Sequence, residues 1–457
     1  MFKYARALLS SDANVWKVLL YRFWTIIAGI ITVIFVPRYL TAEMQGYYYT
    51  FLSVVALQVL FDLGLSQTVA QVSSHEFAHI DLSRSDFGIS NVRIGKLAYV
   101  KSVVAKWYRW VGGLFIVAVA IFGTAYFSFF GTGFDEVWLG PWIVLVISTG
   151  LNLILSPRLA MVEGAGWTGA VANLRLFQSM LGYGLLVVCL IYGGQLWSVA
   201  AVPVTANICS LLWLRWTHNP YRSMPAYVLQ IHNHAPWRSE ILRLQWRVAV
   251  AWLGGYFASQ TIVPVVFALR GADEAGKIGL GLQIFTAVQA LGMSWISARI
   301  PLFGQLISRA DWTALKTQFV KAAVSATVVS AAFAVAVATV LEGVRFTDLS
   351  LAARIPSALA IGALIIISTL NTVIYAMAAY MRAHKEEPLV ISSLVIGGMT
   401  FVGAVLGGYV STDAAVGAYA AVTIVINLPW TLLIFRKYYG RDNSSKDCDA
   451  GQASVAK

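Results

Sequence analysis

The sequence has few charged residues: Asp, Glu, Lys and Arg make up 12% of its 457 residues, against about 25% in ordinary soluble proteins. It also lacks a polar stretch long enough to fold as a separate soluble domain. A nucleic-acid-binding protein clusters its basic residues on such a domain, so the formal net charge of +12 does not indicate a nucleic-acid partner.

Two common catalytic motifs are missing as well, the phosphate-binding GxxxxGK[ST] and the nucleophile motif GxSxG. We therefore predict no bound ATP as an energy source, no enzymatic activity of these kinds and no cofactor. Cysteine is scarce: Cys189 and Cys209 lie in apolar runs and Cys448 lies in the polar C-terminal stretch, with no CxxC pair. This spacing predicts neither a disulfide framework nor a structural zinc site.

Hydrophobic residues, by contrast, make up 58% of the chain. Many apolar runs reach the roughly 20 residues that cross hydrocarbon as a helix, so we predict an all-α polytopic membrane protein with about twelve transmembrane helices. Trp and Tyr occur near many ends of these runs, as expected of interfacial side chains. The predicted spans are 18–37, 45–70, 110–130, 138–160, 169–192, 197–216, 247–269, 277–300, 321–341, 355–380, 388–410 and 415–435.

The distribution of basic residues supports twelve spans with both termini in the cytoplasm, because cytoplasmic loops carry an excess of Lys and Arg. This layout leaves only five of the 33 basic residues on the opposite side, and one missed span would move every later loop across the membrane. The five are Arg38, Arg270, Lys277, Arg345 and Arg354.

Two connections have a composition of their own. Residues 90–110 combine apolar residues at helical spacing with five basic ones, which predicts an amphipathic helix on the anionic inner leaflet. We divide the chain into an N-terminal six-helix half, a cytoplasmic connection, a C-terminal six-helix half and a disordered tail. The boundaries of these four parts are 1–216, 217–246, 247–436 and 437–457.

A short internal repeat relates the halves. Pro37 is followed by A-E-M-Q-G at 42–46, and Pro264 is followed by A-D-E-A-G at 272–276. In each segment, we predict that the proline lies at the outer end of a span and that a short loop then leads into the next span. Two parallel six-helix halves around a central cavity are typical of alternating-access transporters. The alternative is that short outer loops commonly contain Ala, Gly and acidic residues.

Several charged and polar residues fall within or at the ends of the predicted spans. Arg175 lies inside span five, and Arg22, Arg247 and Arg299 lie at span ends. If they line a cavity, it is cationic and suits phosphate or carboxylate, because guanidinium favours bidentate contact with these groups. The alternative is that their guanidinium groups extend to the membrane–water interface. Uncharged polar residues within the spans are also predicted to face the interior, and hydrogen bonding between helices is the alternative for each of them. They are Gln58, Gln67, Gln71, Gln260, Gln283, Gln289, Asn371 and Tyr375.

The segment HEFAH at 75–79 matches the H-E-x-x-H motif of zinc metalloproteases. On a helix this spacing places His75 and His79 on one face, with Glu76 as a general base. The segment falls at or beyond the end of span two, and no third ligand is evident. We keep a membrane metalloprotease as a remote alternative and predict no metal site.

Residues 36–71, VPRYLTAEMQGYYYTFLSVVALQVLFDLGLSQTVAQ, resemble the polysaccharide flippases (Wzx-like O-antigen and exopolysaccharide translocases) of the multidrug/oligosaccharidyl-lipid/polysaccharide superfamily. The shared pattern is an outer proline, a short A-E-x-x-G turn and a span that ends in D-L-G-L. The resemblance covers essentially the whole chain, because the span count and the recurrence at Pro264 agree with it.

This resemblance implies a flippase that moves a polyprenyl-pyrophosphate-linked oligosaccharide from the inner to the outer leaflet of a bacterial inner membrane. It implies alternating access, a cation-lined cavity, coupling to H+ or Na+, and a role in exopolysaccharide or lipopolysaccharide biosynthesis beside polysaccharide polymerase machinery. A drug or small-molecule exporter of the same superfamily is the alternative. Such exporters place acidic residues within their spans, whereas acidic residues here lie almost wholly in loops and ends. A non-transporting scaffold would not need so many polar groups within its spans.

Asp62 is the acidic residue that departs from this distribution. It lies about 25 Å along span two at about 1.5 Å per residue, which places it near the inner boundary. A carboxylate there is either functional or close to water. We expect it to pair with a basic residue or to cap backbone near the cytoplasmic gate, and a gating or ion-coupling role is the alternative.

Overall fold

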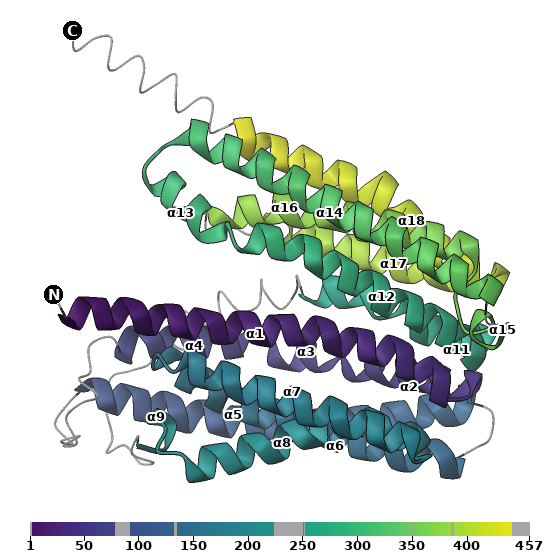
Figure 1. The fold of residues 1–457 in the computed structure, drawn as a ribbon, viewed down its shortest axis with the longest axis horizontal. Coiled ribbons are helices and arrows are strands. Elements are labelled where there is room, and N and C mark those ends of the chain that lie inside the picture. The colour runs from purple at the N-terminus through teal and green to yellow at the C-terminus, as the bar shows by residue number, and fades with distance from the viewer. Residues whose placement is uncertain are drawn as a thin grey trace, which may run out of the picture. The chain divides into compact units, whose positions relative to one another are not determined.

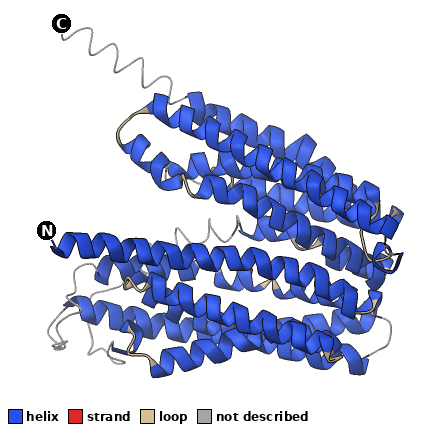
Figure 2. Ribbon diagram, viewed as in Figure 1, coloured by secondary structure: helices blue, strands red, loops and turns tan. Residues whose placement is uncertain are grey.

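The protein is helical nearly throughout (Figure 2). The computed structural model describes residues 2–77, 92–131, 135–223, 250, 252–347, 349–384 and 388–440, and none of these residues is in a strand. The chain divides into two compact units, Met1–Ala249 and Val250–Lys457. In the described ranges, eleven helices are long and apolar enough to cross a membrane. The protein is therefore a multi-pass integral membrane protein, which confirms the predicted fold class.

The N-terminal half has one helix or helix series for each predicted span (Figure 1). It comprises α1 (Phe2–Tyr39), α2 (Ala42–Val55), α3 (Gln58–Asp62), α4 (Leu65–Phe77), α5 (Val92–Phe130), α6 (Asp135–Gly164), α7 (Thr168–Ile191), the 3-10 turn η1 (Gln195–Trp197), α8 (Ser198–Trp216) and α9 (Pro220–Ser223). The amphipathic stretch predicted at 90–110 is not a separate helix, because α5 continues from it into the third span without a break.

The C-terminal half is built in the same way. It comprises α11 (Ile262–Arg270), α12 (Ala272–Ser297), α13 (Ile300–Ser308), α14 (Trp312–Thr347), α15 (Leu349–Ala352), α16 (Ala358–Ala383), α17 (Val390–Val410), α18 (Thr412–Val422) and the π-helical turn η2 (Thr423–Asn427). The helix of the last span continues to residue 440, four residues beyond the predicted boundary. Residues 441–457 and most of the predicted connection 217–246 lie outside the described ranges.

The two halves repeat the same pattern of helix packing. In the N-terminal half, α7 packs on α1 and α8, and α6 packs on α4, α5 and α8. In the C-terminal half, α17 packs on α11 and α18, and α16 packs on α12, α14 and α18. These are the same pairs when the spans of each half are counted from one to six. The packing therefore supports the internal repeat that the sequence suggests.

The repeated segments are the first turns of helices and not loops. α2 begins at Ala42, where the Thr41 side chain accepts a hydrogen bond from the Met44 backbone N–H and Glu43 lies in the first turn. α12 begins at Ala272 after Gly271, whose φ of 90° requires glycine, and carries two acidic residues in its first turn. A hydroxyl cap and carboxylates near the helix N-terminus favour helix initiation. The true connections are only one or two residues long.

Span two is broken, which explains why eleven long helices are found where twelve spans are predicted. The turns at 56–57 and 63–64 divide it into α2, α3 and α4. Leu63 and Gly64 both adopt positive φ values, 51° and 69°. The left-handed conformation costs a non-glycine residue roughly 1–2 kcal/mol. Such strain persists only where surrounding structure enforces it, and it is common at functional sites.

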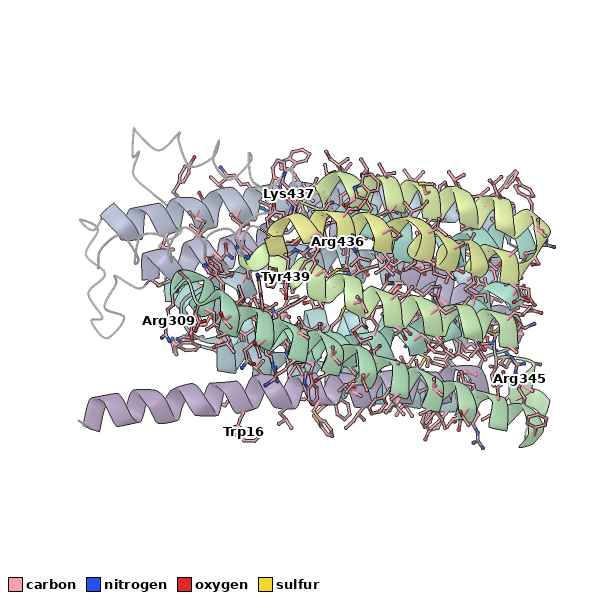
Figure 3. The ribbon with its side chains drawn as sticks, turned by 90° about the horizontal axis from the view of Figure 1, so that it is seen from above. Trp16, Arg309, Arg345, Arg436, Lys437 and Tyr439 are labelled. Carbon is pink, nitrogen blue, oxygen red and sulfur yellow. The ribbon has the colours of Figure 1, made fainter. Side chains whose placement is uncertain are left out.

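The outer surfaces of the halves suit a lipid environment. On α5, the side chains of Leu114, Val117 and Ile121 recur at helical spacing and are more than half exposed, an arrangement that water would disfavour. Charge is found instead at the helix ends of the C-terminal half (Figure 3). Arg309 and Arg436 lie at one end of this half and Arg345 at the other.

Candidate functional site

Asp62 is held by hydroxyl groups at the break in span two. Its Oδ1 atom accepts hydrogen bonds from the Tyr108 hydroxyl at 2.7 Å and from Ser66 Oγ at 2.6 Å. Ser66 Oγ also lies 2.8 Å from Ser156 Oγ. These four residues join α3, α4, α5 and α6, and we call them the Asp62 cluster. The basic partner or backbone cap that we expected is replaced by hydroxyl donors.

The cluster gives the carboxylate charge-assisted hydrogen bonds, which are shorter and about twice as strong as neutral ones. It therefore ties the broken span to two neighbouring helices. A hydroxyl-lined carboxylate also has the chemistry to exchange a proton or to hold a small cation. The gating or ion-coupling role of Asp62 stays a prediction.

We predict that Asp62 and Tyr108 contribute to stability as a unit. Tyr108→Phe should lower the free energy of unfolding by about 1–2 kcal/mol, because a hydrogen bond to a charged group is lost. In an Asp62→Asn background the same change should cost less, by about 0.5 kcal/mol or more. A double-mutant cycle of unfolding in mixed micelles measures this difference. Tyr192→Phe is the control, since Tyr192 is 85% exposed; additive effects of Asp62→Asn and Tyr108→Phe would contradict the coupling.

The predicted substrate-binding arginines are distributed over the chain: two belong to the N-terminal unit, one belongs to the C-terminal unit and one lies outside the described residues. Arg175 in α7 forms an ion pair with Glu163 at the end of α6, with 2.9 Å between Arg175 Nη2 and Glu163 Oε1. The Arg175 side chain is 42% exposed, so the pair contributes little to stability. Arg22 is an exposed residue of α1. Arg299 lies at the break between α12 and α13, and Arg247 lies outside the described residues.

A pocket of about 280 Å³ lies within the C-terminal half, and we call it the polar pocket. Arg382 is the one charged residue among its described lining residues. The other polar side chains come from α12, α16, α17, η2 and the helix that follows η2. They are Gln289, Asn371, Tyr375, Ser392, Ser393, Asn427 and Thr431.

Hydrogen bonds between helices position several of these groups. The Tyr375 hydroxyl lies 3.0 Å from Ser297 Oγ and joins α16 to α12. Asn371 Nδ2 donates to the Tyr419 hydroxyl at 3.0 Å and joins α16 to α18. Gly254 and Gly255 line the same pocket without side chains. Amides, hydroxyls and one guanidinium together can bind a hydroxylated or anionic ligand.

Asn427 reaches the polar pocket from the π-helical turn η2. Pro429 follows two residues later, and proline removes a helical N–H and crowds the preceding turn, so it accounts for the widened helix. Single π turns of this kind are frequent at functional sites. Gln289, Asn371 and Tyr375 were candidates from the sequence, whereas Arg382 and Asn427 were missed. Asn427 could have been identified from the sequence, because it lies two residues before a proline within a predicted span.

The H-E-x-x-H segment receives no support as a metal site. The backbone of α4 includes positions 75 and 76 but ends at Phe77, and position 79 lies outside the described residues. Among the residues that were described, no group of three or more His, Cys, Asp or Glu side chains is placed to hold a metal ion. The described side chains include none of His75, Glu76 and His79, so the metalloprotease alternative stays untested.

The comparisons place the fold among membrane transporters. No protein-family model and no curated protein matches the sequence. An inward-facing multidrug resistance MATE family transporter of the MOP superfamily matches with a TM-score of 0.64 and 15% identity, over 93% of this chain and 96% of that one. The lipid II flippase MurJ in an inward closed conformation matches with a TM-score of 0.60 and 10% identity, over 94% and 87%.

A third match is also a transporter of the MOP superfamily. It is a MOP superfamily transporter from Pyrococcus furiosus for which a reversed polarity of the binding pocket was taken to suggest a different function. Its TM-score is 0.55 and its identity 14%, over 94% of this chain and 96% of that one. The protein therefore has the fold shared by MOP superfamily transporters and the lipid II flippase.

Proposed function

We propose that the protein is a flippase that moves a polyprenyl-pyrophosphate-linked oligosaccharide from the inner to the outer leaflet of a bacterial inner membrane by alternating access. The observation that carries this proposal is the lining of the polar pocket, where Arg382 is accompanied by amides and hydroxyls and the described lining has no carboxylate. Guanidinium suits a pyrophosphate, and the neutral groups suit sugar hydroxyls.

The size of the polar pocket agrees with partial enclosure of such a substrate. Its volume of about 280 Å³ is just below the usual range of small-molecule pockets. It would hold the pyrophosphate with part of the adjoining sugar, while the remaining sugars and the polyprenyl chain stay outside. A solved protein of similar fold is the lipid II flippase MurJ, and this likeness supports a lipid-linked substrate.

An ion-coupled exporter of small molecules is the second candidate, because other proteins of this fold are multidrug transporters. The Asp62 cluster favours coupling to H+ or Na+ in either case. An exporter of cationic drugs would benefit from a carboxylate in its pocket, and the described lining of the polar pocket has a guanidinium instead. We therefore propose an anionic substrate. The proposal also includes polysaccharide polymerase machinery as a further partner and a topology with both termini in the cytoplasm.

The test measures lipid-linked oligosaccharide in bacteria depleted of this protein. We expect the polyprenyl-pyrophosphate-linked oligosaccharide to accumulate severalfold, with its sugars protected from a membrane-impermeant glycosidase added outside inner-membrane spheroplasts. Re-expression of the wild-type chain should restore the normal level. Unchanged amounts and unchanged accessibility of the lipid-linked sugar would reject the flippase and favour the exporter.

A further inference from the structure

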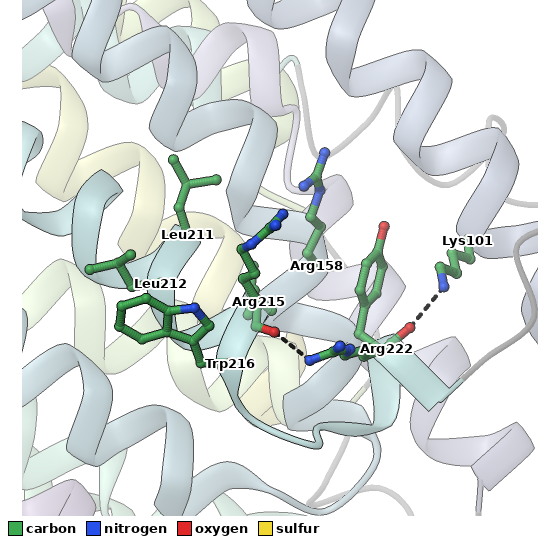
Figure 4. A pocket seen from close by; sticks show the side chains of 9 residues that line it. Lys101, Arg158, Leu211, Leu212, Arg215, Trp216 and Arg222 are labelled. Carbon is green, nitrogen blue, oxygen red and sulfur yellow. Dashed lines mark hydrogen bonds between the residues drawn. The ribbon is translucent and has the colours of Figure 1, made fainter.

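A strongly basic pocket lies at one end of the N-terminal half, between α5, α6, α8 and α9 (Figure 4). It has a volume of about 870 Å³, and we call it the basic pocket. Four of its lining residues are cationic: Lys101, Arg158, Arg215 and Arg222. No Asp or Glu belongs to its lining in the described part of the chain.

Two of the cations hold the pocket together. Lys101 Nζ donates to the Tyr221 carbonyl at 2.8 Å and lies 4.4 Å from the centre of the Tyr221 ring. The Arg222 guanidinium donates to the Arg215 carbonyl. These bonds fasten the short helix α9 to α5 and α8. They use backbone carbonyls as acceptors, so they neutralise neither positive charge.

The other two cations are Arg158, which is half-buried, and Arg215, which is exposed. In the described ranges, neither the Arg158 nor the Arg215 guanidinium has a hydrogen-bond or ion-pair partner. Figure 4 shows both side chains extended in the same direction, between Leu211 on one side and Lys101 on the other. Each guanidinium offers a planar fork of N–H donors that matches the oxygens of a phosphate.

Like charges dominate the field around these groups. The charge of Arg158 acts on Lys101 and also on Tyr221. Burial raises the pKa of the Tyr221 hydroxyl, and the charges of Arg158 and Arg109 oppose this rise. Four cations line this one pocket, and no carboxylate belongs to its described lining, so the cations repel one another. A bound anion would relieve this repulsion.

One wall of the pocket is apolar and exposed. Leu211, Leu212 and Trp216 of α8 are 47%, 39% and 69% exposed, and all three line the pocket beside the arginines. A site for a soluble anion has no need of such a wall. Acyl chains would cover the leucines, and tryptophan is typical of the level of the lipid headgroups. The predicted topology puts this end of the half in the cytoplasmic leaflet, where anionic lipids attract basic residues.

We propose that the basic pocket binds the phosphate headgroup of an anionic phospholipid, with Arg158 and Arg215 on the phosphate and the acyl chains along α8. This site is formed by other residues than the polar pocket, and its occupancy does not depend on the proposed transport function. The lipid would brace α5, α6, α8 and α9 against one another.

The experiment measures binding of phosphatidylglycerol to the purified full-length protein by native mass spectrometry. Phosphatidylcholine with the same acyl chains is the zwitterionic control lipid. The test variant is Arg158→Gln/Arg215→Gln. The matched control is Arg309→Gln/Arg436→Gln, which removes two exposed arginines of the C-terminal half and changes the net charge equally.

We expect wild-type protein to prefer phosphatidylglycerol over phosphatidylcholine and the test variant to bind it about thirtyfold more weakly. The matched control should bind as the wild type does. If both double variants lost phosphatidylglycerol binding equally, the loss would result from the change in overall charge, and the proposal would be overturned. Complete displacement of the lipid by millimolar inorganic phosphate would indicate a soluble-anion site and would also overturn it. If the test variant does not fold, an absent lipid preference in the wild type is sufficient to reject the site.

Discussion

Replacing Arg382 by glutamine is expected to lower transport of the lipid-linked substrate about a hundredfold, because the pyrophosphate loses a charge-assisted hydrogen bond. The variant should still insert and fold, since Arg382 is exposed near the end of α16. The measurement is translocation of a labelled lipid pyrophosphate in proteoliposomes, read from its accessibility to an external phosphatase. The thermal unfolding midpoint is recorded in parallel.

Two further variants sharpen this prediction. Arg382→Lys keeps the charge but loses the planar fork, so an intermediate rate is expected. Arg309→Gln removes an exposed arginine outside the polar pocket and should leave the rate unchanged. Wild-type transport by Arg382→Gln would rule out the polar pocket as the pyrophosphate site, whereas an equal loss in Arg309→Gln would show that the effect is not local.

The second large effect is expected where α17 crosses the segment before α11. A methyl group on Gly397 would overlap the Gly254 carbonyl, and one on Gly254 would overlap the Ser393 carbonyl. Small residues at such crossings allow two helix backbones to touch. Gly397→Ala should therefore destabilise the protein by about 2–3 kcal/mol or more, because backbone cannot rotate away as a side chain can.

The chain supplies a matched control for each glycine. Gly398 and Gly255 are the direct neighbours, and a methyl group on either would meet nothing within 4 Å. Gly398→Ala should be neutral or slightly stabilising, because alanine has the higher helix propensity. The measurement is the yield of monodisperse protein after extraction, together with its thermal unfolding midpoint. Similar behaviour of Gly397→Ala and Gly398→Ala would contradict the close crossing.

The fold could be predicted from the sequence because its determinants are local. Hydropathy gives the spans, and the repeat around Pro37 and Pro264 gives the halves. The break in span two could not be predicted, because no proline marks it and Leu63 adopts a positive φ that leucine rarely takes. The stretch 90–110 was predicted to be an amphipathic helix on the inner leaflet; it is helical from Val92, but α5 continues from it into the third span without a break.

The candidate site was only partly predictable, because its members converge from distant segments. Asp62 was identified as an isolated carboxylate, but its partner Tyr108 is 46 residues away and carries no signal of its own. The polar pocket likewise assembles from several helices, so Arg382 looked like an ordinary basic residue at a span end. Conversely, Arg175 stood out by its depth, and only the structure shows that Glu163 accompanies it.

The interrupted second span also constrains which side of the N-terminal half can touch lipid. At the first turn the backbone hydrogen bonds shorten to i→i−3, from the Leu57 N–H to the Val54 carbonyl and from the Val59 N–H to the Ala56 carbonyl. At the second turn the left-handed Leu63 and Gly64 end α3, and the first N–H groups of α4 need partners outside that helix. Hydrocarbon offers no hydrogen bonds, so irregular backbone at membrane depth must be covered by protein or face water. The side of span two that carries residues 56–57 and 63–64 is therefore a hydrated or protein-covered surface, and the bilayer must contact the half elsewhere, over apolar faces such as that of α5.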